Sequence, residues 1–207
     1  MTGSPPVLLD ACVLVNFALC DTLLRLAEPP RLFAPKWSSQ IMEETTRTLR
    51  NKLAWPDSLV DYFESQLRVH FTDAWIEGYQ EHISQMTNEP KDRHVVAAAV
   101  HAGAPIILTF NLRHFRRADL ASWRVTALHP QQFLVELYRQ EPELVLSKLK
   151  QQASDRHRTL DQLLAILNPL VPEFVSVVDF VFEMGRSFRK RSRRRERQRI
   201  LAQSAPT

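Results

Sequence analysis

Three acidic residues occupy positions where a carboxylate is costly unless it has a specific task. Asp10 interrupts the apolar run Val7–Val15, where a buried strand should end, and Glu44 and Asp92 each lie on a predicted amphipathic helix. Removing a carboxylate from water is unfavourable unless a partner compensates the charge. A divalent cation is such a partner, because Mg²⁺ and Mn²⁺ prefer oxygen ligands. We therefore treat the three acids as candidate metal ligands.

Carboxylates that converge on a cation suit the hydrolysis of phosphodiester bonds. A bound Mg²⁺ or Mn²⁺ offsets the phosphate charge and helps to generate a hydroxide near neutral pH. Like charges at close range raise one another's pKa, so the metal would also stabilise the acids. A zinc site is not indicated, because the sequence has no Cys pair and no His-x₃-His spacing.

Each acid also has an ordinary structural explanation. Asp10 and Asp92 could accept hydrogen bonds from free backbone N–H groups at helix starts, and Glu44 alone is typical of a solvated helix face. Glu43 competes with Glu44 for the same role. We favour Glu44, because it follows Ile41 by three residues and so lies nearer to the buried face.

Short apolar runs alternate with helical patterns around these acids. The runs predict strands at residues 7–9, 32–34, 106–109 and 124–127. Helices are predicted before Pro29, from a cap at Ser38 or Ser39, over 57–67, and from Asp92 to Gly103. This alternation is typical of a mostly parallel α/β sheet covered by helices. Ligands of such folds bind beyond the carboxyl ends of the strands, where Asp10 and Thr109 stand.

After about residue 131 the pattern becomes helical, with Pro142, Pro169 and Pro172 dividing the helices. We therefore expect an α/β domain over 1–130, a helical C-terminal extension over 131–187, and a basic, disordered tail over 188–207. The Leu-rich helices of the extension are better explained as core or partner-docking surface than as catalytic elements.

The net charge of +4 hides an asymmetry. The segment Arg189–Arg199 contains eight Lys or Arg and one acid; the rest of the chain keeps 19 basic and 22 acidic residues, a charge of about −3. A basic run of this kind suits a phosphate backbone through counterion release, although a solvated end is an equally good explanation.

The sequence indicates a cytoplasmic protein. No apolar stretch reaches the roughly 18 residues that a membrane span needs, so we expect no membrane partner. The N-terminus has no basic region of the kind that signal peptides carry. The two cysteines, Cys12 and Cys20, do not form a disulfide framework, which favours a reducing compartment.

Four segments resemble the motifs of PIN-domain proteins. They are VLLDACVL at 7–14, WSSQIMEE at 37–44, KDRHVVAA at 91–98 and TFNLRHF at 109–115. Their order and spacing fit, the resemblance covers roughly residues 6–130, and the last two motifs are the most specific. The chain is most similar to bacterial VapC-type toxins of toxin–antitoxin modules, in the branch with a helical C-terminal extension.

The resemblance implies a PIN-like fold and a Mg²⁺- or Mn²⁺-dependent endoribonuclease that acts on RNA and is inhibited by a cognate antitoxin protein. It makes Asp10, Glu44 and Asp92 the metal-binding and catalytic acids. Thr109 and Asn111 would support them. His114 stands where the fourth motif normally has Asp, which subtracts one charge and one oxygen ligand.

Several basic residues lie near the expected site. Arg113, Arg116 and Arg117 could clamp RNA phosphates, although a solvated basic loop explains them equally well. His94 could bind phosphate or metal, but bracing the helix start by hydrogen bonding is the simpler role. His114 could act as a ligand or proton donor, because imidazole titrates near neutrality, although a surface His that replaced an unneeded acid explains it equally well.

Two other functions stay open at this point. The change from Asp to His at 114 could have removed turnover, leaving a PIN-fold module that binds RNA or the antitoxin. A structure-specific DNA nuclease would use the same acids. The oligomeric state is not fixed by the sequence, and a homodimer is among the options.

Overall fold

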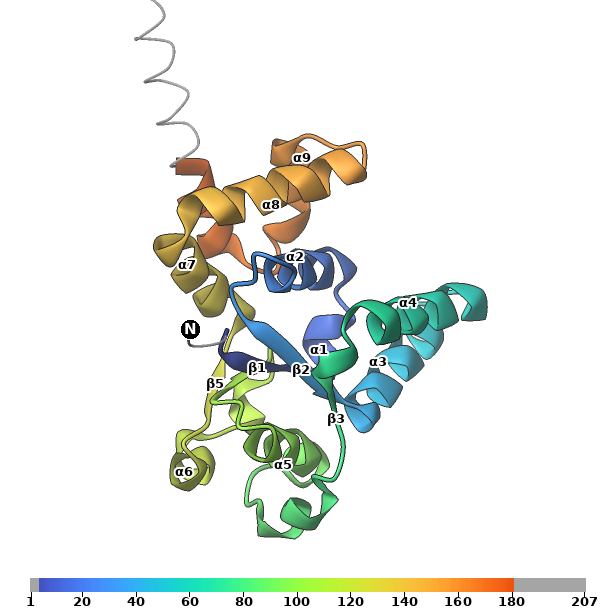
Figure 1. Cartoon of the computed structure of the whole chain (residues 1–207), viewed down its shortest axis with the longest axis vertical. Coiled ribbons are helices and arrows are strands. Elements are labelled where there is room, and N and C mark those ends of the chain that lie inside the picture. Colours follow the sequence, from blue (N-terminus) through green and yellow to red (C-terminus); the bar gives the residue numbers. More distant parts are fainter. Residues whose placement is uncertain (1–3, 181–207) are drawn as a thin grey trace, which may run out of the picture.

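The predicted strands form one parallel sheet at the centre of the molecule (Figure 1). The computed structural model describes residues 4–180. Its sheet has the order β3-β2-β1-β4-β5, and all four pairings are parallel. The strands are β1 (Pro6–Leu9), β2 (Ala34–Ser38), β3 (Trp75–Ile76), β4 (Ile106–Leu108) and β5 (Thr126–Leu128). The expectation of an α/β fold with a PIN-like parallel sheet is confirmed.

The register brings two strand ends together. Val7, Leu8 and Leu9 of β1 are fully buried, as expected for a central parallel strand covered on both faces. Leu9 pairs with Leu108 of β4. Asp10 and Thr109, which follow these two residues, therefore emerge at the same edge of the sheet.

Helices cover both faces of the sheet, with α2 on one side and α5 on the other (Figure 1). This placement follows from the strand order: the chain steps from β1 to β2 in one direction and from β3 to β4 in the opposite one, and parallel crossovers are right-handed. The helices of this part are α1 (Ala11–Leu14), α2 (Phe17–Ala27), α3 (Ser39–Asn51), α4 (Asp57–His70), α5 (Arg93–His101) and α6 (Arg117–Leu120). Short 3-10 turns join them: η1 (Thr72–Ala74), η2 (Gln80–Gln85), η3 (Pro90–Asp92), η4 (Leu112–His114) and η5 (Ala121–Trp123).

Local signals explain where the helices begin and end. Ser38 caps α3, since its hydroxyl accepts a hydrogen bond from the Ile41 N–H at 3.2 Å. The Pro29-Pro30 pair follows the end of α2. Gly103 follows α5 with φ +61°, a left-handed conformation that glycine adopts without strain. These three boundaries agree with the sequence-based predictions.

Two strand positions differ from the prediction, and one strand was missed. β2 begins at Ala34 instead of residue 32 and contains Pro35, which pairs with Val7. Proline is tolerated there because β3 pairs only with Trp37 and Ser38, so β2 is a sheet edge at Pro35. β5 covers 126–128 instead of 124–127. β3 has two residues, too few to show a periodic pattern.

The C-terminal extension is helical and packs against α2. It consists of α7 (Pro130–Gln140), α8 (Pro142–Asp155), α9 (Leu160–Leu167) and a helical segment over 172–180. Buried apolar side chains of the extension and of the α/β part form one continuous core. The predicted boundary at 187 and the basic tail 188–207 lie outside the described residues.

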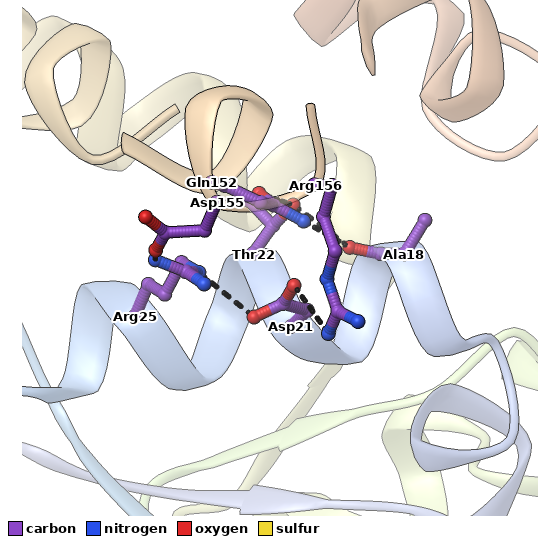
Figure 2. Close-up of polar contacts among 7 residues, drawn as sticks. All are labelled: Ala18, Asp21, Thr22, Arg25, Gln152, Asp155 and Arg156. Atoms are coloured by element: carbon purple, nitrogen blue, oxygen red, sulfur yellow. Dashed lines mark hydrogen bonds and ion pairs between the residues drawn. The ribbon is translucent and has the colours of Figure 1, made fainter. Parts of the chain in front are cut away.

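A polar cluster joins α8 to α2 within this interface (Figure 2). The buried Gln152 side chain accepts a hydrogen bond from the Thr22 hydroxyl at 2.8 Å and donates one to the Ala18 carbonyl at 3.0 Å. Beside it, the guanidinium of Arg25 pairs with Asp21 at 2.8 Å and with Asp155 at 2.7 Å. The extension is therefore anchored to the helix that follows the Asp10 segment.

Among residues 4–180, no helix is long and apolar enough to cross a membrane.

Candidate functional site

Asp10 lies buried where β1 passes into α1. Its backbone N–H donates to the Leu108 carbonyl at 3.0 Å, which extends the β1–β4 ladder by one bond. The residue occupies the N-cap position of α1, yet its side chain makes no capping hydrogen bond. Only 5% of its surface is exposed. The carboxylate is thus available for a role other than helix capping.

Two donors hold one oxygen of this carboxylate. Asp10 Oδ2 accepts a hydrogen bond from the Thr109 hydroxyl at 2.7 Å and another from the Cys12 thiol at 3.1 Å. Burial, followed by the charge of Asp10, raises the pKa of Cys12 to about 12, so the sulfur keeps its proton and remains a donor. Cys12 Sγ accepts from the Phe110 N–H at 3.3 Å, and Thr109 Oγ1 from the Asn111 N–H at 3.0 Å. The ends of β1 and β4 are thereby linked through side chains.

Asp92 lies at the junction of η3 and α5, in contact with His114. Asp92 Oδ2 and His114 Nδ1 are 2.8 Å apart, and the two side chains are only 14% and 11% exposed. Arg113 Nε donates a hydrogen bond to His114 Nε2 at 3.1 Å. Since Nε2 is then the acceptor, the neutral ring carries its proton on Nδ1. Nδ1 lies close to Asp92 Oδ2 but is not aligned with it as a hydrogen bond, so the two side chains are in contact without one.

The pKa of Asp92 is raised above its ordinary value. Burial is the largest cause, and the charge of Asp10 is the second; Lys91 and His114 act in the opposite direction. The effect of Asp10 shows that these two acids interact electrostatically.

Glu44 contacts a second imidazole. Its carboxylate Oε1 lies 3.1 Å from Nε2 of His94, which is 3% exposed and follows Asp92 by two residues. Glu44 itself is half-buried, whereas Glu43 is exposed. The contact links α3 to the start of α5, so Glu44 lies near the segment that carries Asp92. The choice of Glu44 over Glu43 as a ligand stays a prediction.

The donor set fits a divalent cation in its chemistry. Asp10 and Asp92 are mostly buried oxygen donors, and neither forms an ion pair with Lys or Arg within residues 4–180. A nearby cation would relieve the repulsion that raises the pKa of Asp92. In the described part of the chain, however, no three His, Cys, Asp or Glu side chains are gathered closely enough to form a metal-binding group. Convergence of all three acids on one ion stays a prediction.

The other predicted residues lie around the β4 end. Asn111 is half-buried before η4, and Arg113 and Arg117 are exposed. Arg116 forms an ion pair with Asp119 at 2.8 Å, and the Asp119 carboxylate compensates the charge of the guanidinium. None of these positions tests a contact with RNA.

The sequence analysis gave Cys12 no role in the site and did not consider Arg93 or Asn88. The donor role of Cys12 depends on the pairing of β1 with β4, although its position two residues after Asp10 was a usable signal. Arg93 and Asn88 line a pocket beside His114. Nothing in their local sequence indicates that pocket, because it forms only when the loop, α5 and η4 meet.

Comparison with known proteins identifies a relative for more than half of the chain. A protein of Mycobacterium tuberculosis (strain ATCC 25618 / H37Rv) named "Putative ribonuclease VapC50" is 37% identical over 120 residues, which cover 56% of this chain and 71% of the relative. No family model matches the chain. No solved structure matches it.

Proposed function

The chain belongs to the VapC family of PIN-domain ribonucleases, and from this premise we propose that it is a divalent-metal-dependent endoribonuclease, the toxin of a toxin–antitoxin pair. The observation that carries the proposal is a pair of acids, the buried Asp10 at the end of β1 and the mostly buried Asp92 at the start of α5. Neither has a Lys or Arg partner among the described residues; two donors hold Asp10, and the His114 ring lies against Asp92. Such a pair is suited to a cation that it can share with a phosphate.

Asp10, Asp92 and Glu44 would hold Mg²⁺ or Mn²⁺. When bound, the ion supplies charge neutralisation for the phosphate and favours deprotonation of a water molecule. Thr109 and Cys12 keep the Asp10 carboxylate in one orientation, which limits the reorganisation needed during reaction.

An imidazole lies beside each of the remaining acids. His114 contacts Asp92, and His94 contacts Glu44, so each ring would limit the positions that its carboxylate can take. With water as the nucleophile, the ribose 2′-OH is not required. The products should therefore carry 5′-phosphate and 3′-hydroxyl ends.

The second candidate function is a PIN-fold module that binds RNA or the antitoxin without turnover. The observation that favours it is the contact of His114 with Asp92, because an imidazole occupies one side of a carboxylate where the motif would supply another acid. The two functions share their partners, RNA and an antitoxin protein, and differ in catalysis.

The discriminating experiment is incubation of the purified full-length chain with mixed-sequence RNA in Mg²⁺, in Mn²⁺ and in EDTA. We expect cleavage with either metal, none in EDTA, and loss of cleavage in Asp10→Asn, which removes charge with little change in volume. DNA of the same sequence serves as a parallel substrate. Absence of cleavage with both metals, together with retained RNA binding, would favour the second function.

The toxin assignment has a separate test. A small antitoxin gene should adjoin the gene of this chain, and its product should suppress the growth arrest that the chain causes on expression. Growth arrest by Asp10→Asn at equal protein level would argue against ribonuclease action as the cause.

A further inference from the structure

A second pocket lies beside His114, next to the acid site. The loop before η3, the start of α5 and η4 border an open pocket of about 290 Å³, near the lower end of the sizes typical of ligand sites. Three arginines, Arg93, Arg113 and Arg116, line it. His114 lines it as well and also contacts Asp92, so the pocket adjoins the acid site.

The pocket carries uncompensated positive charge. Arg116 is paired with Asp119, whereas neither Arg93 nor Arg113 forms an ion pair with an acid in the part of the chain that the structure describes. Each of these two guanidiniums uses its Nε for a local bond, Arg93 to the Asn88 carbonyl at 3.3 Å and Arg113 to His114. Their terminal amino groups make no hydrogen bond to any described residue, and so they are free to bind a ligand. Glu89 is the one acid among the described residues that line the pocket.

The wall of the pocket also contains a buried polar group without a partner. Asn88 is 2% exposed, and neither its amide nitrogen nor its amide oxygen has a hydrogen-bond partner within residues 4–180. Native proteins rarely leave such groups unpaired, so each one calls for an explanation. Both atoms are covered from solvent, so a ligand in the pocket would contact them only after the Asn88 side chain rotates.

We propose that this pocket binds one phosphate of the RNA strand through Arg93 and Arg113. This phosphate is a neighbour, along the same strand, of the phosphate at which cleavage occurs. The planar guanidinium offers paired donors that match phosphate oxygens. The shared wall at His114 would place that phosphate next to the acid site and so fix the register of the strand. This inference rests on the proposed function, because it assumes that the strand crosses the acid site.

The test uses the full-length chain in EDTA, where RNA stays intact, and a single-stranded 12-nucleotide RNA of mixed sequence. Affinity is measured against salt for the wild type, Arg93→Gln, Arg113→Gln and the double variant. Arg139→Gln, an exposed arginine on α7 outside the pocket lining, controls for loss of one charge. A set of RNAs with one neutral methylphosphonate each then locates the phosphate.

The double variant should bind on the order of tenfold more weakly, as expected for loss of charged hydrogen bonds. The slope of log K against log salt should shrink by about 0.7, the value for one neutralised phosphate in a single strand. One methylphosphonate position should weaken wild-type binding and have no further effect in the double variant, because the two changes remove the same interaction. Arg139→Gln should leave the slope close to that of the wild type.

An unchanged slope in the double variant, or a methylphosphonate effect that persists in it, would overturn the proposal. Thermal melts check folding; if Arg93→Gln is destabilised, the exposed Arg113→Gln decides the question alone. Cleavage by the wild type in Mn²⁺ is measured in parallel. If the wild type cleaves RNA but the binding tests fail, only the phosphate pocket is refuted. If the wild type does not cleave RNA, the proposed function is refuted, and the binding measurements alone decide whether the pocket binds phosphate.

Discussion

His114 stands where the PIN-type motif has an aspartate, and its contact with Asp92 shows what the replacement does locally. The imidazole lies against the carboxylate and favours its ionised form, without adding a negative charge or an oxygen ligand. The motif departure was visible in the sequence. The contact was not, because it joins α5 to η4 across residues that local patterns do not connect.

His114→Asp should strengthen metal binding and speed cleavage, and should lower the stability of the metal-free protein. Two carboxylates in contact repel each other unless a cation lies between them. Calorimetric titration with Mn²⁺, a thermal melt in EDTA and single-turnover cleavage measure the three effects. His114→Asn, which adds no charge, is the matched control. If His114→Asp binds Mn²⁺ no better than His114→Asn, the added charge lies outside the metal site.

The raised pKa of Asp92 predicts how stability depends on pH without metal. A carboxyl with a higher pKa in the folded than in the unfolded state binds its proton more tightly when folded. Its contribution to the unfolding free energy is therefore present at low pH and is lost as the pH rises from the ordinary value, about 4, through the raised one.

Asp92→Asn removes this titration and should raise Tm in EDTA at pH 7. The difference in Tm between Asp92→Asn and the wild type should become smaller as the pH falls toward 4. In a chain of this length, each 1 kcal/mol of unfolding free energy corresponds to about 2–4 °C in Tm. Circular dichroism melts across that range measure it. A lower Tm for Asp92→Asn at pH 7 would mean that its contact with His114 outweighs burial and the charge of Asp10.

At the scale of elements, α8 and α2 are joined by a buried amide as well as by apolar contacts. Gln152→Ala removes two hydrogen bonds to α2 and should lower the unfolding free energy by about 1–3 kcal/mol. Chemical denaturation measures the loss. Gln151→Ala is the control, since Gln151 is an exposed neighbour on the same helix. Equal losses in both variants would show that helix propensity, and not the contact with α2, sets the effect.

Elements with strong local signals were predictable from the sequence, and elements defined by their neighbours were not. The buried run of β1, the Ser38 cap and the Gly103 end carry their own signals. β3 exists only because Trp75 and Ile76 can pair with the end of β2. The contact of Gln152 with Thr22 also depends on tertiary packing, since 130 residues separate the two in sequence.

At the scale of the whole molecule, the positive charge belongs to the C-terminal segment. The tail 189–207, outside the described residues, contains eight Lys or Arg in its first part. Deleting it should weaken RNA binding and flatten its salt dependence, by about 0.7 in slope for each phosphate that the tail neutralises. Fluorescence anisotropy at several salt concentrations measures this. An unchanged slope would assign the tail to solubility or to a protein partner.

The family followed from the motifs, while the arrangement of donors required the fold. Asp10 and Thr109 could be placed at one sheet edge from the sequence, because parallel strand ends coincide. That His94 and His114 each engage one acid could not be read from spacing alone.

Asp10, Asp92 and Glu44 should bind one divalent ion together, and a calorimetric Mn²⁺ titration is the decisive experiment. We predict one firmly bound Mn²⁺ per wild-type chain, and at least about tenfold weaker binding, about 1.4 kcal/mol, in Asp10→Asn, Asp92→Asn and Glu44→Gln. Glu43→Gln, which changes the exposed neighbouring acid, should bind like the wild type. Wild-type affinity in Glu44→Gln, or weakened binding in Glu43→Gln, would show that Glu44 is not the third ligand of a shared ion.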